Sequence, residues 1–442
     1  MKTTKHFSRT GAIVDLGAIR SNLEAFRGLV KPGTKLLATV KANAYGHGAC
    51  EVANALAGAA DMFSVACTDE GLELREAGGI IEPILVLGPS FTEDDEDAIA
   101  YGLTQTVFTY ERAWQLNESA RVFFEELDRL EKLQSGELQE DAEDLVTKTV
   151  RDLETFRAGG GDSAENEVKT PSKSRLQEAF ETYGIKDRKA HIHIAVDTGM
   201  SRIGLSPDAQ GLIELDRIHS LPYISIDGIF THFATADETD KTHTMEALGR
   251  FRKFREMVKM SGMEIPVWHC ANTASIIDGI GLDFDMVRVG IGLYGMYPSE
   301  EVKKENVSLK PVLLWYSYLT RVREIEAGTS VSYGYKYTAD RKVKVGTVCV
   351  GYADGYRRGL SLKGTEVLVN GVRCPVLGSI CMDQMMIDVS EVPGATPGTP
   401  VILIGAVGKE AVTAEELAGR LGTINYEITC GISERVPRKY VG

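Results

Sequence analysis

Residues 36–48 read LLATVKANAYGHG, and this stretch decides the fold that the rest of the sequence predicts. Its opening apolar run is too short for a helix and is closed by polar and glycine residues, which is typical of a buried parallel strand. Lys41 stands at the carboxyl end of that strand. In an α/β barrel this end carries the functional loops, and an amine at the apolar mouth has a lowered pKa. A lone lysine more often simply ends a strand and reaches solvent, so the residue alone decides nothing.

Strands alternate with helices on both sides of this stretch. Residues 16–29 have apolar residues at helical spacing, with Asp15 as a candidate N-cap. Strands are predicted at residues 62–66 and 84–87, with helices at residues 50–60 and 68–77. This alternation indicates βαβ units in a parallel sheet. The units continue past four and no GxGxxG follows the first strand, so a (β/α)8 barrel is favoured over a doubly wound sheet.

The later barrel strands are predicted at residues 190–196 and 224–230, and near residues 267 and 286. Lys41, His232, Thr273 and Arg288 all fall at strand ends, the one face of a barrel where side chains converge. A single histidine there is more often structural, so the convergence carries the prediction of a site. Arg202, in the segment after residue 196, has the fork geometry that holds a carboxylate or a phenolate oxygen.

The acidic segment at about residues 115–190 interrupts the barrel pattern. Residues 125–157 are dense in charged side chains, and GGGDS and TPSKS follow at residues 159–163 and 170–174. This composition favours a solvated, helical and partly disordered surface excursion over a regulatory or partner-binding insert.

A second, mostly β domain is predicted from about residue 308. Strand-like runs separated by glycine turns stand at residues 315–322, 343–350, 366–369 and 400–404, and helices nearly vanish. The predicted domains are therefore a barrel at residues 11–305, with the insertion at about 115–190, and a β domain at residues 306–442. Residues 1–10 are a candidate partner of the β domain.

The composition predicts a cytoplasmic protein. Hydrophobic residues make up 43% of the 442 residues, no apolar stretch approaches membrane-spanning length, and the N-terminal residues lack a signal peptide's apolar segment. The net charge of −14 argues against nucleic acid or an anionic membrane as partner. Seven scattered cysteines without CxxC spacing indicate reduced thiols, and no metal site is predicted.

Taken together, these motifs resemble those of the alanine racemases, fold-type III enzymes that use pyridoxal 5'-phosphate (PLP). The LLATVKANAYGHG stretch is similar to the family's cofactor-lysine motif, and the resemblance runs from about residue 14 to residue 438, interrupted by the acidic insertion. It includes VSYG at residues 331–334 and GSICMDQ at residues 378–384. The resemblance implies an isomerase that interconverts L-alanine and D-alanine, and so supplies D-alanine for peptidoglycan.

The resemblance also implies the roles of single residues. Lys41 would form the Schiff base with PLP and serve as one catalytic base, and Tyr333 would be the other. In the family that tyrosine reaches the cofactor from the partner subunit, so a homodimer with shared sites is implied. The cofactor-binding residues implied are Lys41, Tyr45, His232, Asn272, Thr273, Arg288, Gly290 and Ile291. The substrate-facing residues implied are Arg202, Met382 and Asp383.

The chemistry of racemisation agrees with these roles. A proton must leave one face of the substrate α-carbon and return on the other, so two opposed acid–base groups are required. Free tyrosine has a pKa near 10, so roughly a thousandth is ionised at pH 7. Nearby cations such as Arg288, acting through His232, would favour the phenolate form of Tyr333. An arginine on the pyridine nitrogen is a poor proton donor, which leaves that nitrogen unprotonated and disfavours transamination.

Three positions depart from the family pattern. Ala195 stands where many relatives have a lysine that orients the arginine matching Arg202, so a bound chloride is expected to substitute. Glu434 replaces a tyrosine of the substrate pocket and is expected to point away from the phosphate, and Ser379 stands where arginine is frequent. These departures leave a serine or broader-specificity racemase as an alternative. A basic-amino-acid decarboxylase is disfavoured by the VSYG motif, and a non-catalytic PLP-homeostasis protein by the second domain.

Overall fold

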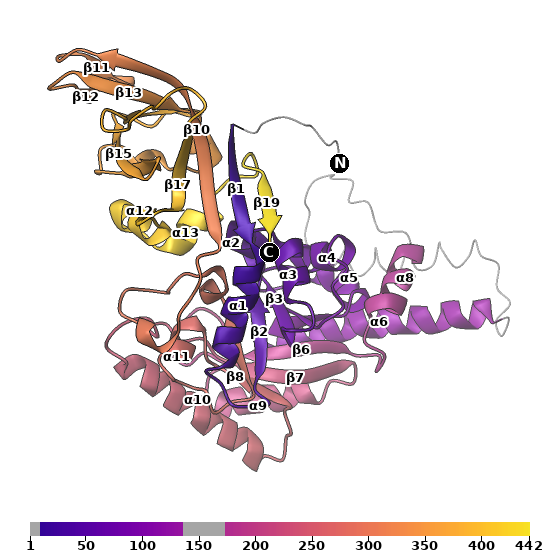
Figure 1. Ribbon diagram of the computed structural model, residues 1–442. Coiled ribbons are helices and arrows are strands. Elements are labelled where there is room, and N and C mark those ends of the chain that lie inside the picture. The colour runs from indigo at the N-terminus through magenta and orange to yellow at the C-terminus, as the bar shows by residue number, and fades with distance from the viewer. Residues whose placement is uncertain (1–8, 136–172) are drawn as a thin grey trace.

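The computed structural model describes residues 9–135 and 173–442 of the chain (Figure 1). The predicted (β/α)8 barrel followed by a mostly β domain is confirmed. Among the described residues, no helix combines the length and the apolar character that crossing a membrane requires. The predicted limits of the two domains remain a prediction.

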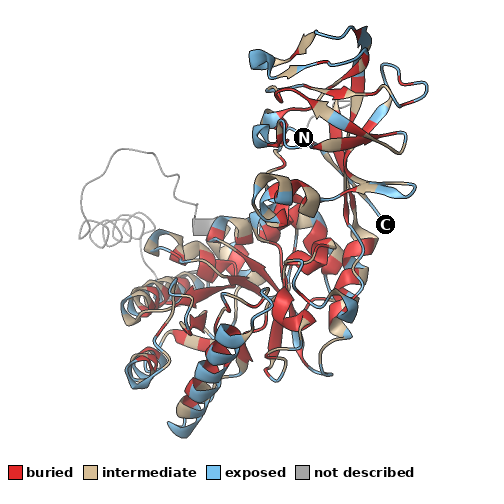
Figure 2. Ribbon diagram, turned by 90° about the vertical axis from the view of Figure 1, so that its left-hand side faces the viewer, coloured by how far each residue is buried: buried red, intermediate tan, exposed pale blue. Residues whose placement is uncertain are grey.

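Eight parallel strands close the barrel, and β9 pairs back onto β2 with Leu36 opposite Val287. The strands are almost wholly buried, as expected for parallel strands covered by helices (Figure 2). In chain order they are β2 (Lys35–Thr39), β3 (Met62–Val65), β4 (Ile84–Val86), β5 (Leu103–Val107), β6 (Ala190–Ala195), β7 (Ile224–Phe230), β8 (Val267–His269) and β9 (Met286–Val289).

Helices surround the strands with one apolar face inward and a polar face outward. The first begins as predicted, because the Asp15 side chain accepts a hydrogen bond of 2.8 Å from the Ala18 amide. In chain order the principal helices are α1 (Leu16–Arg27), α3 (Ala49–Leu56), α4 (Thr68–Glu76), α5 (Asp95–Ala100), α6 (Tyr110–Gln134), α8 (Lys173–Tyr183), α9 (Ala209–His219), α10 (Thr242–Met260) and α11 (Thr273–Ile277).

The acidic segment is described only at its two ends. Helix α6 is 25 residues long and extends well beyond the barrel (Figure 1), and α8 leads back to β6. Phe124 of α6 and Phe180 of α8 pack edge to face with ring centroids 5.8 Å apart. The GGGDS stretch and most of TPSKS lie outside the described residues.

The second domain is built on a nine-stranded sheet in the order β18-β17-β14-β15-β16-β13-β10-β1-β19. The first strand of the chain belongs to this sheet, because β1 is antiparallel to β10 and parallel to β19. The strands are β1 (Thr10–Asp15), β10 (Leu313–Ile325), β13 (Val343–Val348), β14 (Glu366–Val369), β15 (Val372–Leu377), β16 (Met385–Asp388), β17 (Pro400–Val407), β18 (Glu410–Val412) and β19 (Arg438–Val441). A separate hairpin pairs β11 (Ser330–Val331) with β12 (Tyr337–Thr338).

The sequence predicted that helices nearly vanish in this domain, and two short α-helices are present there. They are α12 (Ala414–Leu421) and α13 (Asn425–Cys430). Helix α12 begins at Thr413, whose hydroxyl accepts a hydrogen bond of 3.1 Å from the Glu416 amide. Helix α13 contacts the segment that follows Lys41, so it forms one wall of the barrel mouth.

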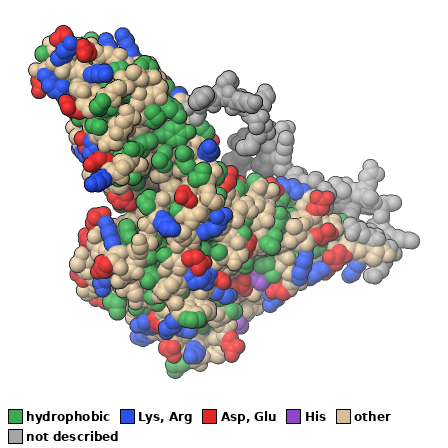
Figure 3. Space-filling model, in the orientation of Figure 1, with side chains coloured by type: hydrophobic (Ala, Val, Ile, Leu, Met, Phe, Trp, Pro, Cys, Tyr) green, Lys and Arg blue, Asp and Glu red, His purple; other side chains and the backbone are tan. Residues whose placement is uncertain are grey.

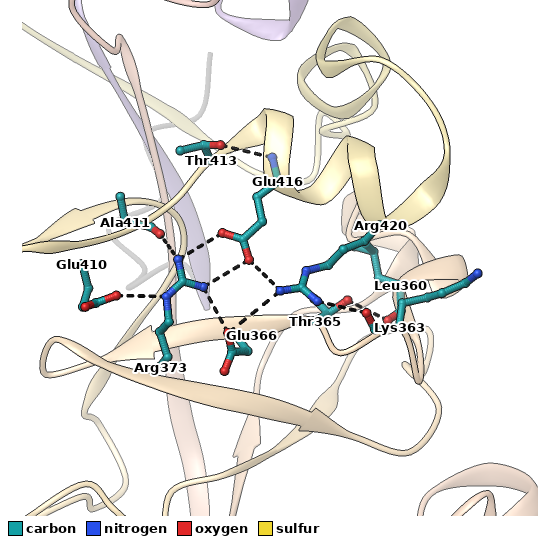
Figure 4. A network of polar contacts seen from close by, with 10 residues as sticks. All are labelled: Leu360, Lys363, Thr365, Glu366, Arg373, Glu410, Ala411, Thr413, Glu416 and Arg420. Carbon is teal, nitrogen blue, oxygen red and sulfur yellow. Dashed lines mark hydrogen bonds and ion pairs between the residues drawn. The ribbon is translucent and has the colours of Figure 1, made fainter. Parts of the chain in front are cut away.

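A network of charges joins α12 to the sheet (Figure 4). Arg373 of β15 forms ion pairs with Glu366, Glu410 and Glu416, at N–O distances of 3.1, 3.0 and 3.1 Å. Arg420 of α12 adds a pair of 2.9 Å with Glu416. The two guanidinium groups thus hold three carboxylates together across three strands and one helix.

Candidate active site

The segment after β2 has an unusual backbone. Its hydrogen bonds are those of a short helix, α2 (Lys41–Gly46), but residues 42–45 all have φ between 52° and 54°, the left-handed region. Each such residue costs about 1–2 kcal/mol when it is not glycine. Local hydrogen bonds hold the turn. The Ala44 amide donates to Val40 O at 2.8 Å, and His47 Nδ1 lies 2.9 and 3.0 Å from the carbonyl oxygens of residues 44 and 45.

Lys41 opens this turn and is half-buried. Burial lowers the pKa of its amine, and the charges of Arg202 and Arg288 lower it further, against an opposing effect from Glu70 and Cys430. More of the amine is therefore neutral near pH 7 than in an ordinary lysine, which suits an amine that acts as nucleophile or base.

Arg288 of β9 lies under the barrel mouth, buried among histidines. Its Nη1 is 2.9 Å from His269 Nδ1, and its Nη2 is 3.1 Å from His232 Nδ1 and 2.8 Å from Thr231 O. The other ring nitrogen of His269, Nε2, is 2.9 Å from His193 Nδ1. Four side chains from four neighbouring strands or their ends, β6 to β9, thus form one continuous chain of hydrogen bonds.

The arginine fixes the protonation of that chain, because a guanidinium can only donate. His269 must accept at Nδ1, so as a neutral ring it carries its proton on Nε2 and donates to His193. Burial together with the Arg288 charge keeps the pKa of His269 well below its usual value. Burial is also the main cause that lowers the pKa of His193 to about 4 and that of His232 to about 3. All three rings are neutral near pH 7.

The predicted phosphate-side residues lie together beside this chain. Tyr45 is 7% exposed, and its ring centroid is 4.9 Å from that of Tyr294. A Cβ atom built on Gly290 would stand only 3.0 Å from the Tyr45 hydroxyl oxygen, so glycine leaves room where the two approach. The Gly290 amide donates to Thr273 Oγ1 at 2.9 Å. Asn272 caps α11, with its Oδ1 3.0 Å from the Ser275 amide, and Ile291 follows with its side chain buried.

Arg202 reaches the same mouth from the loop after β6, since its charge acts on both Lys41 and His232. No hydrogen bond or ion pair joins its guanidinium to any residue in the described ranges. Ala195, the last residue of β6, is 2% exposed and offers only a methyl group. The side chain that could orient Arg202 from this strand is therefore missing.

The predicted residues of the β domain lie apart from the barrel mouth within one chain. Tyr333 stands between β11 and β12, which Figure 1 shows at the end of the β domain that is remote from α2. Tyr333 is 70% exposed and Met382 is 52% exposed. Ser379 supports the tyrosine loop, because its hydroxyl donates to Tyr333 O at 3.1 Å. Asp383 forms an ion pair of 2.6 Å with Arg435.

Hydrophobic side chains gather on the outside of the β domain in the view of Figure 3. Several large hydrophobic side chains of this domain are exposed to solvent. They include Tyr333, the predicted second base, and also Tyr335, Tyr352 and Met382. Glu434, which replaces a pocket tyrosine of the family pattern, is exposed as well.

Sequence reasoning missed several residues of the barrel mouth. It did not single out His193 and His269, which extend the hydrogen-bonded chain beyond Arg288. It also did not single out Glu70, which accepts a hydrogen bond from the turn after Lys41. A signal for the histidines was present, because both stand in mostly buried strands whose inward side chains must meet inside the barrel. No signal in the sequence identified Glu70, whose partners are backbone amides.

Comparisons with known proteins agree with this arrangement. The family model described as "Alanine racemase, N-terminal domain" matches residues 14–136 and 164–298, and "Alanine racemase, C-terminal domain" matches residues 312–440. A curated alanine racemase of Halothermothrix orenii is 38% identical over 433 residues, which cover 98% of this chain and 96% of that protein. One of Clostridium tetani is 37% identical over 440 residues, covering 99% and 96%.

Solved structures show the same likeness. An alanine racemase of Clostridium difficile 630 is similar with a TM-score of 0.80 and 35% identity, covering 99% of this chain and 97% of that one. The alanine racemase from E. faecalis gives a TM-score of 0.77 at 32% identity, with both chains covered completely (100%). Both domain models and these full-length relatives lead to one conclusion: the chain belongs to the alanine racemase family.

Proposed function

We propose that this chain is a PLP-dependent racemase that interconverts L-alanine and D-alanine in the cytoplasm and so provides D-alanine for peptidoglycan. The observation that carries the proposal is the half-buried Lys41 amine at the mouth of a barrel, whose pKa is lowered by burial and by two arginines. Relatives named alanine racemase, at 35–38% identity over nearly the whole chain, support alanine as the substrate.

The barrel mouth fits the proposed cofactor. The amine of Lys41 can bind a carbonyl carbon. The hydroxyl groups of Tyr45 and Thr273 both approach Gly290, and a phosphate group could accept hydrogen bonds from them. Arg288 holds its neighbours mainly through Nη2, and its Nε–H makes no hydrogen bond with the described residues. That group is available to a pyridine nitrogen. When bound, PLP withdraws electrons from the substrate α-carbon and so makes its proton removable.

The chain's own residues would then place and move one proton. Lys41 Nζ takes or returns the α-proton on one face, and the Tyr333 hydroxyl does so on the other. Arg288 cannot give up a proton at neutral pH, although burial lowers its pKa to about 10. It therefore holds the ring nitrogen by donation alone. Arg202 and the backbone near Met382 would orient the substrate carboxylate.

We expect Tyr333 to meet Lys41 from another chain. Within one chain the tyrosine loop lies at the far end of the β domain (Figure 1), with its aromatic ring mostly in solvent. A homodimer in which each β domain covers the partner's barrel mouth would bury these exposed aromatic side chains and complete two active sites.

An anion beside Arg202 is part of the same proposal. The guanidinium has no charged partner among the described residues, and Ala195 cannot supply one. A chloride bound between Arg202 and β6 would neutralise this charge and fix the direction of the guanidinium plane. In chloride-free buffer we expect a higher KM for alanine, and adding chloride should restore the lower value. A KM that does not respond to chloride would contradict the anion site.

The direct test incubates the purified protein with L-alanine and with L-serine in separate reactions, followed by chiral chromatography. We expect D-alanine to form, and borohydride reduction of the PLP-loaded protein to fix the cofactor on Lys41 in the tryptic map. Label on another lysine, or no D-amino acid, would overturn the proposal. Lys310, an exposed lysine in the segment between the barrel and β10, serves as the internal control, because its peptide should remain unlabelled.

Serine is a second candidate substrate on one observation. Glu434 is exposed where the family pattern has a pocket tyrosine, so the pocket has lost an aromatic wall. We expect measurable serine racemisation beside the alanine activity, and a decrease of the serine-to-alanine ratio in Glu434→Tyr. A wild-type protein that ignores serine would contradict this widening of the pocket.

A further inference from the structure

Glu70 connects the ends of two neighbouring barrel strands. It is the third residue of α4, and its carboxylate accepts two backbone hydrogen bonds. Oε1 lies 2.7 Å from the amide nitrogen of Ala42, the residue after Lys41, and Oε2 lies 2.7 Å from that of Ala66, the residue after β3. One charged group therefore fixes the end of β2 relative to the end of β3.

This contact replaces the bond that a glutamate in this position usually makes. At the third position of a helix, a glutamate side chain typically bonds back to the amide of the N-cap residue. The N-cap here is Cys67, which makes no side-chain cap of its own. The Glu70 carboxylate instead reaches past the N-cap to Ala66 and across to Ala42. Glu70 thus stabilises the turn after Lys41 and the end of β3, and it does not cap its own helix in the usual way.

The turn needs such a contact. Ala42 is the first of four consecutive left-handed residues, none of them glycine, and its backbone amide has Glu70 as acceptor. Hydrogen bonds from a backbone amide to a carboxylate are shorter and stronger than those to a neutral acceptor. Loss of this acceptor would allow residues 42–45 to relax toward ordinary backbone geometry, and the Lys41 side chain would move with them.

The negative charge of Glu70 also acts on the Lys41 amine. The charged or ionisable groups that act on Lys41 are Arg202, Arg288, Cys430 and Glu70. Both arginines lower the pKa of the amine and Glu70 raises it, so the carboxylate limits how far the cationic surroundings depress that pKa.

We propose that Glu70 is a positioning residue of this active site, which holds the left-handed turn after Lys41 in place and supplies the negative charge that faces its amine. The importance of the turn rests on the proposed function of Lys41, whereas the two contacts of Glu70 do not. The two parts of the role, geometry and charge, can be separated by experiment.

The charge is tested on the full-length protein freed of PLP. The rate at which acetic anhydride labels Lys41 is followed against pH by mass spectrometry, because only the neutral amine reacts. Glu70→Gln should move the midpoint of Lys41 labelling to lower pH by about one unit, a tenfold change in the protonation equilibrium. Asp69→Asn is the matched control: it removes the same charge from the same turn of α4, but Asp69 is exposed and bonds to neither amide. Its midpoint should not move.

The geometry is tested by the affinity for PLP, read from the absorbance of the loaded protein. A small displacement of Lys41 from its position toward the cofactor should weaken binding strongly, and we expect about tenfold weaker PLP binding in Glu70→Gln. Glycine adopts positive φ without strain, so Ala42→Gly added to Glu70→Gln should recover most of that affinity. The labelling midpoint of the double variant should stay shifted, because the charge is still absent. Glu70→Asp should show the reverse pattern, with the charge kept and the reach lost.

Several outcomes would contradict the proposed geometric and charge roles of Glu70. A Glu70→Gln protein with the wild-type labelling midpoint and wild-type PLP affinity would overturn the proposal. Equal effects in Asp69→Asn would reduce it to a general charge effect and also overturn it. If Glu70→Gln does not fold, which circular dichroism reports, Glu70→Asp alone decides, because wild-type PLP affinity there would contradict the geometric role. The labelling result stands even if the protein racemises nothing, so failure of the proposed function is distinguishable.

Discussion

Neutral, buried histidines are the residue-scale feature that sets the response of this protein to acid. The pKa of His47 falls to about 4, mainly because of burial, and that of His193 falls to about 4 for the same reason. In the unfolded chain a histidine has a pKa near 6.5. Below that pH the unfolded state binds more protons than the folded state, so stability rises with pH and is lost as pH falls toward 4.

We therefore predict a steep loss of stability between pH 6.5 and 4. Each of the two histidines contributes up to about 1.4 kcal/mol per pH unit to the decrease in the free energy of unfolding. Guanidinium unfolding at several pH values, followed by tryptophan fluorescence, measures the slope. His193→Asn should flatten it, whereas the control His243→Asn, on the exposed face of α10, should leave it unchanged. An unchanged slope in His193→Asn would show that this ring titrates normally in the folded protein.

The proposed second base, Tyr333, gives the other residue-scale prediction. Tyr333→Phe removes only the hydroxyl, and loss of proton transfer by a placed group should reduce kcat about 100- to 10,000-fold. PLP should remain bound, because the proposed cofactor contacts lie in the barrel. The exposed neighbour Tyr335 provides the control, and Tyr335→Phe should stay near the wild-type rate. Deuterium exchange at the α-carbon of each alanine enantiomer then identifies the face that has lost its base.

At the scale of elements, the predictable features are those whose cause is local. Residues 224–230 and 366–369 form β7 and β14 with the predicted bounds, because apolar runs between turn residues suffice to define a strand. Helix α1 begins at its predicted cap. Helix α12 was predictable from the capping pattern of a threonine followed three residues later by a glutamate, at 413 and 416, although the strand-rich surroundings concealed it.

The left-handed turn after Lys41 was not predictable, because its causes lie elsewhere in the chain. Glu70 of α4 and the backbone of α13 at Thr429 both contact it, the latter where a side chain on Gly46 would not fit. The convergence of Lys41, His232 and Arg288 followed from barrel geometry. Nothing local in the sequence indicated the proposed role of Tyr333, which requires a second chain, and it rests on the family resemblance alone.

The charge network of the β domain provides the element-scale prediction. Arg373→Met would leave Glu366, Glu410 and Glu416 facing one another, and we expect a loss of about 1.5–3 kcal/mol of stability in this domain. The lower end applies, because the Arg373 side chain is 31% exposed and solvent screens the pairs. The control is Arg341→Met, which breaks a single ion pair between the 53% exposed Arg341 side chain and Asp388, and it should cost less than about 1 kcal/mol. Chemical denaturation measures the free energy of unfolding of both variants. If Arg373→Met and Arg341→Met lose the same small amount, the network around Arg373 is no more stabilising than a single ion pair.

At the scale of the whole molecule, the separation between barrel mouth and tyrosine loop determines how the active site can be completed. Lys41 lies at the barrel mouth and the exposed Tyr333 lies at the far end of the β domain, and the long strand β10 leads away from the barrel toward that end (Figure 1). An isologous dimer brings each end to the partner's other end, and it does so twice by symmetry. Dissociation should therefore abolish activity without unfolding either domain.

Mixing two inactive variants tests this shared site. Lys41→Ala has lost one base and Tyr333→Phe the other, so neither homodimer contains a complete site. In a hybrid dimer one site would contain Lys41 and Tyr333 from opposite chains, and the other site would contain neither. We expect activity to return on mixing, up to about half of the wild-type value per hybrid dimer. Native mass spectrometry of differently tagged chains establishes that exchange has taken place. Hybrid dimers without activity would mean that the two bases do not meet across subunits, and that Tyr333 reaches Lys41 by some movement within one chain.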